Sequence, residues 1–320
     1  MYLDYLELNQ VVEKEICGPF DKNVKLISNF YNVKLVIKNG KVYIESDDFI
    51  LKDKLERLFK NLINLFNFCS EITERDIIYL LNLIEDNVDD KFNLLLKNRK
   101  IIGYTFKNKP IYPKTLKQLE YLELLDSKDI IFALGKAGTG KTYEAVTYAS
   151  NLLKNGKISK IILTRPVVEA GESLGYLPGD LKEKVDPYLR PLYDALNDNF
   201  GYEQTELLIE KNVIEIAPLA YMRGRTLENA VIILDEAQNT TYLQIKMFLT
   251  RLGFNSKMII TGDESQIDLN YKVESGLVIA NKILRNIEQI GLIHFESIDV
   301  VRHPLVMKII DAFDDYENNR

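Results

Sequence analysis

The chain has 320 residues, of which 46% are hydrophobic and 28% charged, and its formal net charge is −6 at pH 7. This composition excludes intrinsic disorder, and the acidic balance gives no overall attraction for nucleic acid, although a local basic face can coexist with it. No apolar stretch is long enough to span a membrane, and Cys17 and Cys69 lack metal-ligand spacing, so we expect a cytoplasmic protein with reduced thiols and no membrane contact.

Residues 1–96 predict a small α+β domain. Its expected elements are short extended segments at 13–17, 33–37 and 41–44, with helices at 22–31, at 53–68 and after a Thr73 N-cap. Asn39-Gly40 is typical of a tight hairpin turn. The β-α-β-β-α order is that of a KH-like module, but the segment at 18–21 lacks the second glycine of a nucleic-acid-clamping G-x-x-G loop. RNA binding by this domain is therefore a hypothesis.

Residues 97–114 predict a basic connector, because the stretch holds no acidic residue and is interrupted by Gly103, Pro110 and Pro113. Its basic residues are Lys97, Arg99, Lys100, Lys107, Lys109 and Lys114. One interpretation is a solvated linker. The alternative is that these cations, with Tyr104, Phe106 and Tyr112 interleaved, contact nucleic-acid phosphates and bases. A larger domain is expected over residues 115–320.

A phosphate-binding loop of the form G-x-x-x-x-G-K-[ST] follows an apolar run at 130–134 and precedes a helical pattern at 142–153. It consists of Gly135, Lys136, Ala137, Gly138, Thr139, Gly140, Lys141 and Thr142. Glycine permits a backbone whose N–H groups surround a phosphate at a helix N-terminus. Lys141 then reaches the β and γ phosphates, and Thr142 offers its hydroxyl to Mg²⁺. The motif predicts a site for a nucleoside triphosphate with Mg²⁺.

Two further strand patterns end in polar residues. The apolar run at 231–234 precedes Asp235 and Glu236, as in a Walker B element, so we expect Asp235 to hold Mg²⁺ with Thr142 and Glu236 to act as general base. The run at 257–260 precedes Thr261 and, further on, Gln266. Gln266 is the candidate sensor of the γ-phosphate, and Thr261 is a weaker one.

Phosphoryl transfer becomes faster when a guanidinium neutralises charge on the migrating phosphoryl group, so arginines near these patterns are candidates for that role. The candidates are Arg165, Arg223, Arg225, Arg251 and Arg302. Most arginines lie at surfaces or in ion pairs, and we expect at most two of these to be arginine fingers.

The stretch at 163–196, which begins Leu-Thr-Arg-Pro-Val-Val-Glu-Ala-Gly-Glu, closely resembles the PhoH-like ATPases. The resemblance continues at 217–226, 235–241, 247–253 and 299–306, covers residues 114 to about 313, and is looser at 15–85. It implies an α/β P-loop NTPase core similar to superfamily-one helicases. It also implies that Gln118 reads adenine and that Arg302 takes the place of the late helicase arginine.

The same resemblance implies partners. Relatives are linked to RNA metabolism and to an rRNA-processing endoribonuclease of the YbeY type, and they form ring-shaped homo-oligomers. In a ring, Arg223, Arg225 or Arg251 would serve the neighbouring subunit's site. We therefore expect an ATPase acting in RNA or ribosome maturation. The alternative is a nucleotide-gated oligomeric scaffold that recruits an endoribonuclease without remodelling RNA itself.

Overall fold

The structure is a computed structural model, which describes residues 8–69, 71–166, 181–270 and 272–300, together with residues 305, 306, 309, 312, 313 and 316. For residues 181–188 it describes the backbone alone. The chain divides into two compact units: unit 1 is Met1–Arg99, Lys114–Leu116 and Ile298–Arg320, and unit 2 is Lys100–Pro113 and Lys117–Ser297. The domain limits expected from the sequence, 1–96, 97–114 and 115–320, stay a prediction.

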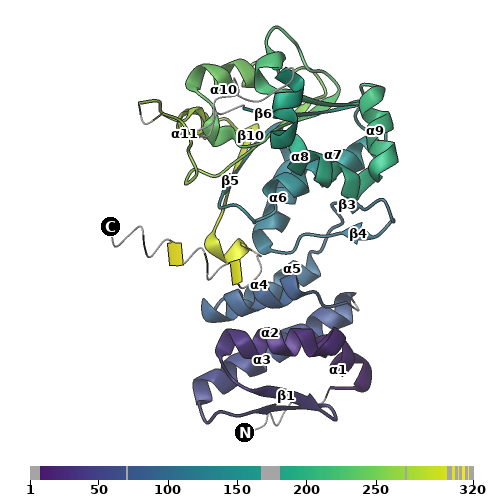
Figure 1. The fold of residues 1–320 in the computed structure, drawn as a ribbon, viewed down its shortest axis with the longest axis vertical. Coiled ribbons are helices and arrows are strands. Elements are labelled where there is room, and N and C mark those ends of the chain that lie inside the picture. The colour runs from purple at the N-terminus through teal and green to yellow at the C-terminus, as the bar shows by residue number, and fades with distance from the viewer. Residues whose placement is uncertain are drawn as a thin grey trace. The chain divides into compact units, whose positions relative to one another are not determined.

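The described residues of unit 1 form helices and a β-hairpin (Figure 1). Its elements are α1 (Gln10–Cys17), η1 (Pro19–Asp21), α2 (Lys22–Tyr31), β1 (Leu35–Lys38), β2 (Lys41–Ile44), α3 (Phe49–Cys69), α4 (Glu74–Glu85), η2 (Asp89–Lys91) and α5 (Phe92–Lys97). β1 and β2 pair antiparallel through Asn39 and Gly40, both with positive φ, as a tight hairpin requires. The expected hairpin is confirmed.

The prediction of an extended segment at 13–17 is wrong, because these residues belong to α1. The side chain of Asn9 caps this helix by accepting hydrogen bonds from the N–H groups of Val11 and Val12. Val12 and Ile16, one helical turn apart, are buried. The expected Thr73 N-cap is confirmed, since Thr73 and Asp76 form a reciprocal capping box at the start of α4.

Unit 2 is built on a six-stranded parallel sheet in the order β10-β5-β9-β8-β6-β7. The strands are β5 (Ile130–Gly135), β6 (Lys160–Arg165), β7 (Ile214–Pro218), β8 (Ala230–Leu234), β9 (Lys257–Gly262) and β10 (Ile290–Phe295). The helices are α6 (Leu116–Ser127), α7 (Lys141–Lys154), α8 (Leu181–Phe200), α9 (Tyr202–Glu210), η4 (Leu219–Met222), η5 (Ala237–Asn239), α10 (Tyr242–Leu249) and α11 (Gly276–Leu284). The last two residues of η6 (Ser297–Asp299) belong to unit 1.

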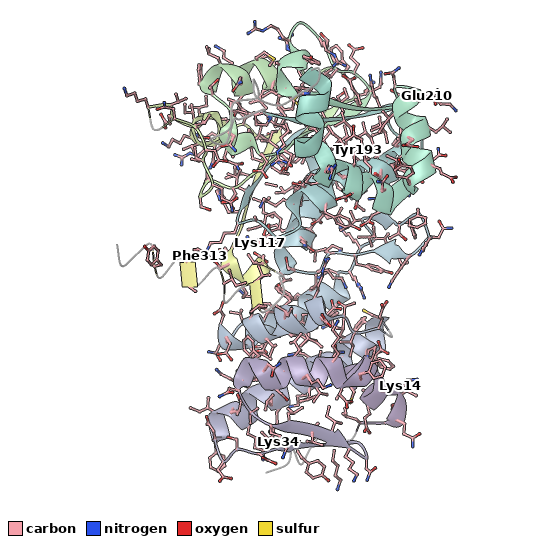
Figure 2. The ribbon with its side chains drawn as sticks, in the orientation of Figure 1. Lys14, Lys34, Lys117, Tyr193, Glu210 and Phe313 are labelled. Atoms are coloured by element: carbon pink, nitrogen blue, oxygen red, sulfur yellow. The ribbon has the colours of Figure 1, made fainter. Side chains whose placement is uncertain are left out.

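Successive strand residues face opposite sides of this sheet and enter two separate cores. Ile131 and Ile233 join a cluster with α6, α7 and α8, against which Tyr193 of α8 packs (Figure 2). Phe132 and Ile232 join a second cluster with α10 and α11 on the other face (Figure 1). A parallel sheet covered by helices on both faces confirms the α/β class.

Much of the expected connector is folded onto unit 2. β3 (Gly103–Tyr104) and β4 (Pro110–Ile111) form a short hairpin. The Phe106 N–H donates to the Asp198 carbonyl at 2.9 Å, and the Lys154 ammonium donates to the Tyr104 carbonyl at 3.0 Å. Residues 103–111 are thus hydrogen-bonded to the rest of unit 2, although residues 106–109 are exposed, and the connector at 97–114 stays a prediction. Among the helices of the described residues, none combines the length and apolarity needed to cross a membrane.

Candidate nucleotide-binding site

The phosphate-binding loop joins the end of β5 to the start of α7. Its three glycines have positive φ: 132° at Gly135, 91° at Gly138 and 85° at Gly140. A Cβ on Gly135 would lie 2.3 Å from the Phe295 carbonyl oxygen, and one on Gly140 would lie 2.9 Å from the Gln118 amide nitrogen. The positive φ favours glycine at both positions, and the Phe295 backbone also excludes a side chain at Gly135; at Gly140 the neighbour is the end of a flexible side chain, which can move.

The Lys141 side chain is buried and curls back over the loop. Its ammonium donates to the carbonyl oxygens of Gly135 at 2.6 Å and Lys136 at 2.8 Å, and to the Thr139 hydroxyl at 3.3 Å. Gln118 of α6 also contacts the loop, because its amide donates to the Thr139 carbonyl at 2.9 Å. The structure thus brings the predicted Lys141 and Gln118 together at one loop.

Three oxygen-bearing side chains meet at the ends of neighbouring elements. The hydroxyl of Thr142, at the start of α7, lies 2.7 Å from Asp235 Oδ1 after β8, and the hydroxyl of Thr261 in β9 lies 2.8 Å from the same oxygen. A carboxylate beside hydroxyl groups is a donor set that suits Mg²⁺. Thr261, which sequence reasoning ranked low, is part of this cluster.

Glu236 has a strained backbone and a carboxylate with two donors. Its φ of 53° lies in the left-handed region. Oε1 lies 3.1 Å from the Arg165 guanidinium, and Oε2 accepts from the Gln238 amide at 2.5 Å. The candidate base is therefore held in one orientation by two side chains.

Asp263 and Gln238 link this carboxylate to the phosphate-binding loop, and sequence reasoning assigned a role to neither. Asp263 Oδ2 accepts from the Ala137 N–H at 2.9 Å, while the Asp263 N–H donates to Gln238 Oε1 at 3.1 Å. The available signal was position, since Asp263 directly follows β9, the strand beside β5. The predicted sensor Gln266 lies exposed in the turn after Asp263.

Arg225 and Arg251 are not brought to this cluster. The Arg225 guanidinium forms two hydrogen bonds with Glu215 of β7, at 2.5 and 2.8 Å, and these lower the pKa of the Glu215 carboxyl to about 2. Arg251 donates to the Arg225 carbonyl at 3.0 Å. β7 lies four strand spacings from β5, about 19 Å. Their predicted roles, including service to a neighbouring subunit, stay predictions, and Arg302 lies outside the described residues.

A cavity of about 610 Å³ lies at the other edge of the sheet, where the strands begin. Its lining includes Asp129 before β5, Lys257 at the start of β9, and Phe254. The volume is in the range of small-molecule sites, but the lining contains no residue of the phosphate-binding loop. The loop and the Asp235 cluster, at the carboxyl edge, remain the candidate site.

The sequence comparisons decide the family. A family model described as PhoH-like protein matches residues 110–314. The chain belongs to the PhoH-like protein family. It is 54% identical to a PhoH-like protein of Bacillus subtilis over 299 residues, which cover 93% of this chain and 92% of that one. It is 44% identical to a PhoH-like protein of Mycobacterium tuberculosis over 308 residues, covering 94% and 85%. The expected resemblance is confirmed.

The solved structures that match this chain are less similar to it in sequence than these relatives are, and they cover less of it. A Sulfolobus solfataricus SWI2/SNF2 ATPase core in complex with dsDNA matches 46% of this chain and 31% of its own at 17% identity, with a TM-score of 0.30. A Pif1 helicase from Candida albicans matches 57% of this chain and 40% of its own at 13% identity, with a TM-score of 0.29. RNA, the YbeY-type endoribonuclease and the ring-shaped homo-oligomer stay predictions.

Proposed function

We propose that this PhoH-like protein binds ATP with Mg²⁺ and hydrolyses it. The observation that carries the proposal is the meeting of the phosphate-binding loop with the strand-end carboxylate, because Thr142 Oγ1 lies 2.7 Å from Asp235 Oδ1. The loop follows β5 and Asp235 follows β8. The two side chains can meet because only one strand, β9, lies between β5 and β8 in the sheet. Oxygen ligands beside a glycine-rich loop at the start of a helix suit a metal-bound triphosphate.

Each residue of the site has a proposed role. The loop N–H groups and the Lys141 ammonium bind the β and γ phosphates. Thr142 and Asp235 would hold Mg²⁺, which supplies positive charge beside the phosphate oxygens. Glu236 orients the attacking water and accepts its proton, Gln118 reads the adenine, and Gln266 responds to the γ-phosphate.

Phosphate release by the purified full-length chain tests this proposal. We expect Glu236→Gln to retain ATP binding with turnover reduced by about 10²- to 10⁴-fold, the range for a positioned general base. Lys141→Ala should lose ATP binding measured by titration calorimetry, because it removes the cation that faces the phosphates. Lys136→Ala is the matched control in the same loop, because the Lys136 side chain is exposed. It should reduce ATP affinity less than Lys141→Ala does. Wild-type ATP affinity in Lys141→Ala would refute the assignment.

We propose RNA as the polymer on which this ATPase acts, supported by the β3–β4 hairpin. Tyr104 is 40% exposed and Phe106 is 53% exposed, and the Lys107 ammonium lies 5.3 Å from the centre of the Phe106 ring. Aromatic faces next to cations are the surface on which single-stranded bases stack. Among the other predicted connector cations, Lys114 forms an ion pair with Asp76 at 3.0 Å in unit 1.

Fluorescence anisotropy with single-stranded RNA at several salt concentrations tests this second proposal. Changing Lys107 and Lys109 to Ala should weaken binding and reduce the slope of log affinity against log salt, because fewer counterions are released. Changing Lys211 and Lys282, both exposed in unit 2, is the matched control. If wild type binds no RNA at low salt with or without an ATP analogue, the alternative is favoured, a nucleotide-gated scaffold that recruits an endoribonuclease.

A further inference from the structure

Arg165 is the last residue of β6, and the pairing of strands fixes its position beside the candidate site. β6 pairs with β8 in parallel, with Thr164 opposite Leu234. The N–H of Asp235 continues this ladder by donating to the Thr164 carbonyl at 2.9 Å. The backbone of Arg165 therefore lies beside that of Asp235 and Glu236, the two acidic residues that follow β8.

The Arg165 side chain forms an ion pair with the candidate base. Its Nη2 atom lies 3.1 Å from Glu236 Oε1, and the two side chains are only 23% and 33% exposed. Partial burial leaves such a pair less screened than a surface ion pair. The second oxygen of Glu236 is held by Gln238, so the ion pair defines where the carboxylate points.

The other described arginine candidates near the core have different neighbours. Arg225 forms an ion pair with Glu215. Arg251 donates hydrogen bonds to the main-chain carbonyls of Met247 and Arg225. Arg165, by contrast, forms its ion pair with Glu236, a candidate catalytic residue of this site. Its guanidinium is planar and binds phosphate as well as carboxylate.

We propose that Arg165 is shared between the Glu236 carboxylate and the terminal phosphate of ATP. The γ-phosphate carries more negative charge than one carboxylate and competes for the same guanidinium. Binding of a triphosphate then draws Arg165 away from Glu236 and frees Oε1 to face the attacking water. Arg165 thus acts as a positioning residue for Glu236 and as a sensor of the γ-phosphate. This inference rests on the proposed ATPase function.

The test compares ADP with a non-hydrolysable ATP analogue, each titrated with Mg²⁺ into the full-length chain. Arg165→Ala should weaken binding of the ATP analogue by about tenfold or more, the contribution of a charge-assisted hydrogen bond, and leave ADP affinity within about twofold. Arg165→Lys should recover part of the loss, because it keeps the charge without the planar fork. Glu236→Gln should tighten binding of the ATP analogue alone, and adding Arg165→Ala should remove that gain.

Lys160→Ala is the matched control. Lys160 is the first residue of β6, the strand that ends in Arg165, and it also forms an ion pair with a glutamate, Glu215, at 2.8 Å. It should leave the ratio of the two affinities unchanged. An equal loss of both nucleotides in Arg165→Ala, or no tightening in Glu236→Gln, would overturn the sharing of Arg165 while leaving the ATPase proposal intact. A wild-type chain that binds neither nucleotide would overturn both.

Discussion

The carboxylate of Asp263 accepts a hydrogen bond from the main-chain N–H of Ala137, with 2.9 Å between Oδ2 and the nitrogen. Asp263 is buried, and its other oxygen accepts from the N–H and hydroxyl of Ser265. A fixed negative charge therefore sits against the loop that we propose to bind phosphates. Because like charges repel, we expect Asp263 to oppose nucleotide binding while it orders the loop.

We expect Asp263→Asn to tighten ADP binding by about tenfold, because the negative charge is gone. The amide oxygen can still accept from Ala137, although the amide nitrogen loses the hydrogen bond from the Ser265 N–H. Titration calorimetry measures the change. Asp268→Asn is the control from the same loop, since Asp268 is exposed and pairs with Asn239. Weaker ADP binding in Asp263→Asn would mean that ordering of the loop outweighs repulsion.

Glu144 predicts how stability depends on pH. This side chain of α7 is buried, and neither carboxylate oxygen has a hydrogen-bond partner in the part of the chain that the structure describes. Burial raises the pKa of the Glu144 carboxyl well above 4.5. Because the folded state then binds more protons than the unfolded state, the free energy of unfolding falls as pH rises above about 4.5.

Glu144→Gln should therefore raise the melting temperature at pH 8 and leave it nearly unchanged at pH 4.5. Each unit of pKa shift corresponds to about 1.4 kcal/mol, and about 1 kcal/mol moves the melting temperature by about 2–4 °C in a domain of this size. Thermal unfolding at several pH values measures the difference. Glu210→Gln, at the exposed end of α9 (Figure 2), is the control. A difference that does not grow with pH would contradict the prediction.

A comparison of Gly135 with Gly156 distinguishes the cost of backbone strain from the cost of a steric clash with an added Cβ atom. Both have positive φ, 132° and 66°, but a Cβ on Gly135 would lie 2.3 Å from the Phe295 carbonyl oxygen, whereas one on Gly156 would meet nothing within 4 Å. We expect Gly156→Ala to cost about 1 kcal/mol of unfolding free energy. Gly135→Ala should cost at least about 2 kcal/mol more, because the β5–β10 pairing must shift. Equal losses in urea unfolding would argue against the collision.

Local sequence signals predicted much of this protein. The Asn39-Gly40 hairpin, the capping box at Thr73, and the glycine-rich loop between β5 and α7 each depend on a few adjacent residues. The helix α1 was missed because its eight residues make little more than two turns, which is too short for a clear helical period. What decides it is the Asn9 cap and the burial of Val12 and Ile16 against the rest of unit 1.

The contacts between strand ends were not predictable in the same way. Asp263 meets Ala137, and Arg165 meets Glu236, because β9 lies between β5 and β8 while β6 lies on the other side of β8. No periodicity or turn signal reports that order, which depends on how the whole sheet is assembled. The motifs therefore located the residues, and the strand order showed which of them touch.

Gln238 connects Asp263 to Glu236. Its effect on catalysis can be measured separately from its contribution to the stability of the fold. Its side chain is buried, accepts from the Asp263 N–H and donates to Glu236. Gln238→Met keeps the volume but leaves that N–H unpaired, which should cost about 1–3 kcal/mol of unfolding free energy. It also releases Glu236, so we expect ATP turnover to fall by about 10²-fold with ADP affinity within about twofold of wild type.

Gln244→Met is the matched variant for this last prediction, because Gln244 accepts from the Thr241 N–H in the exposed capping box of α10. It should lower the melting temperature through the lost cap and leave the turnover number unchanged. Phosphate release and thermal unfolding are measured on both variants. If turnover falls in both in proportion to stability, Gln238 serves the fold alone; a fall confined to Gln238→Met places it between the phosphate-binding loop and the candidate base.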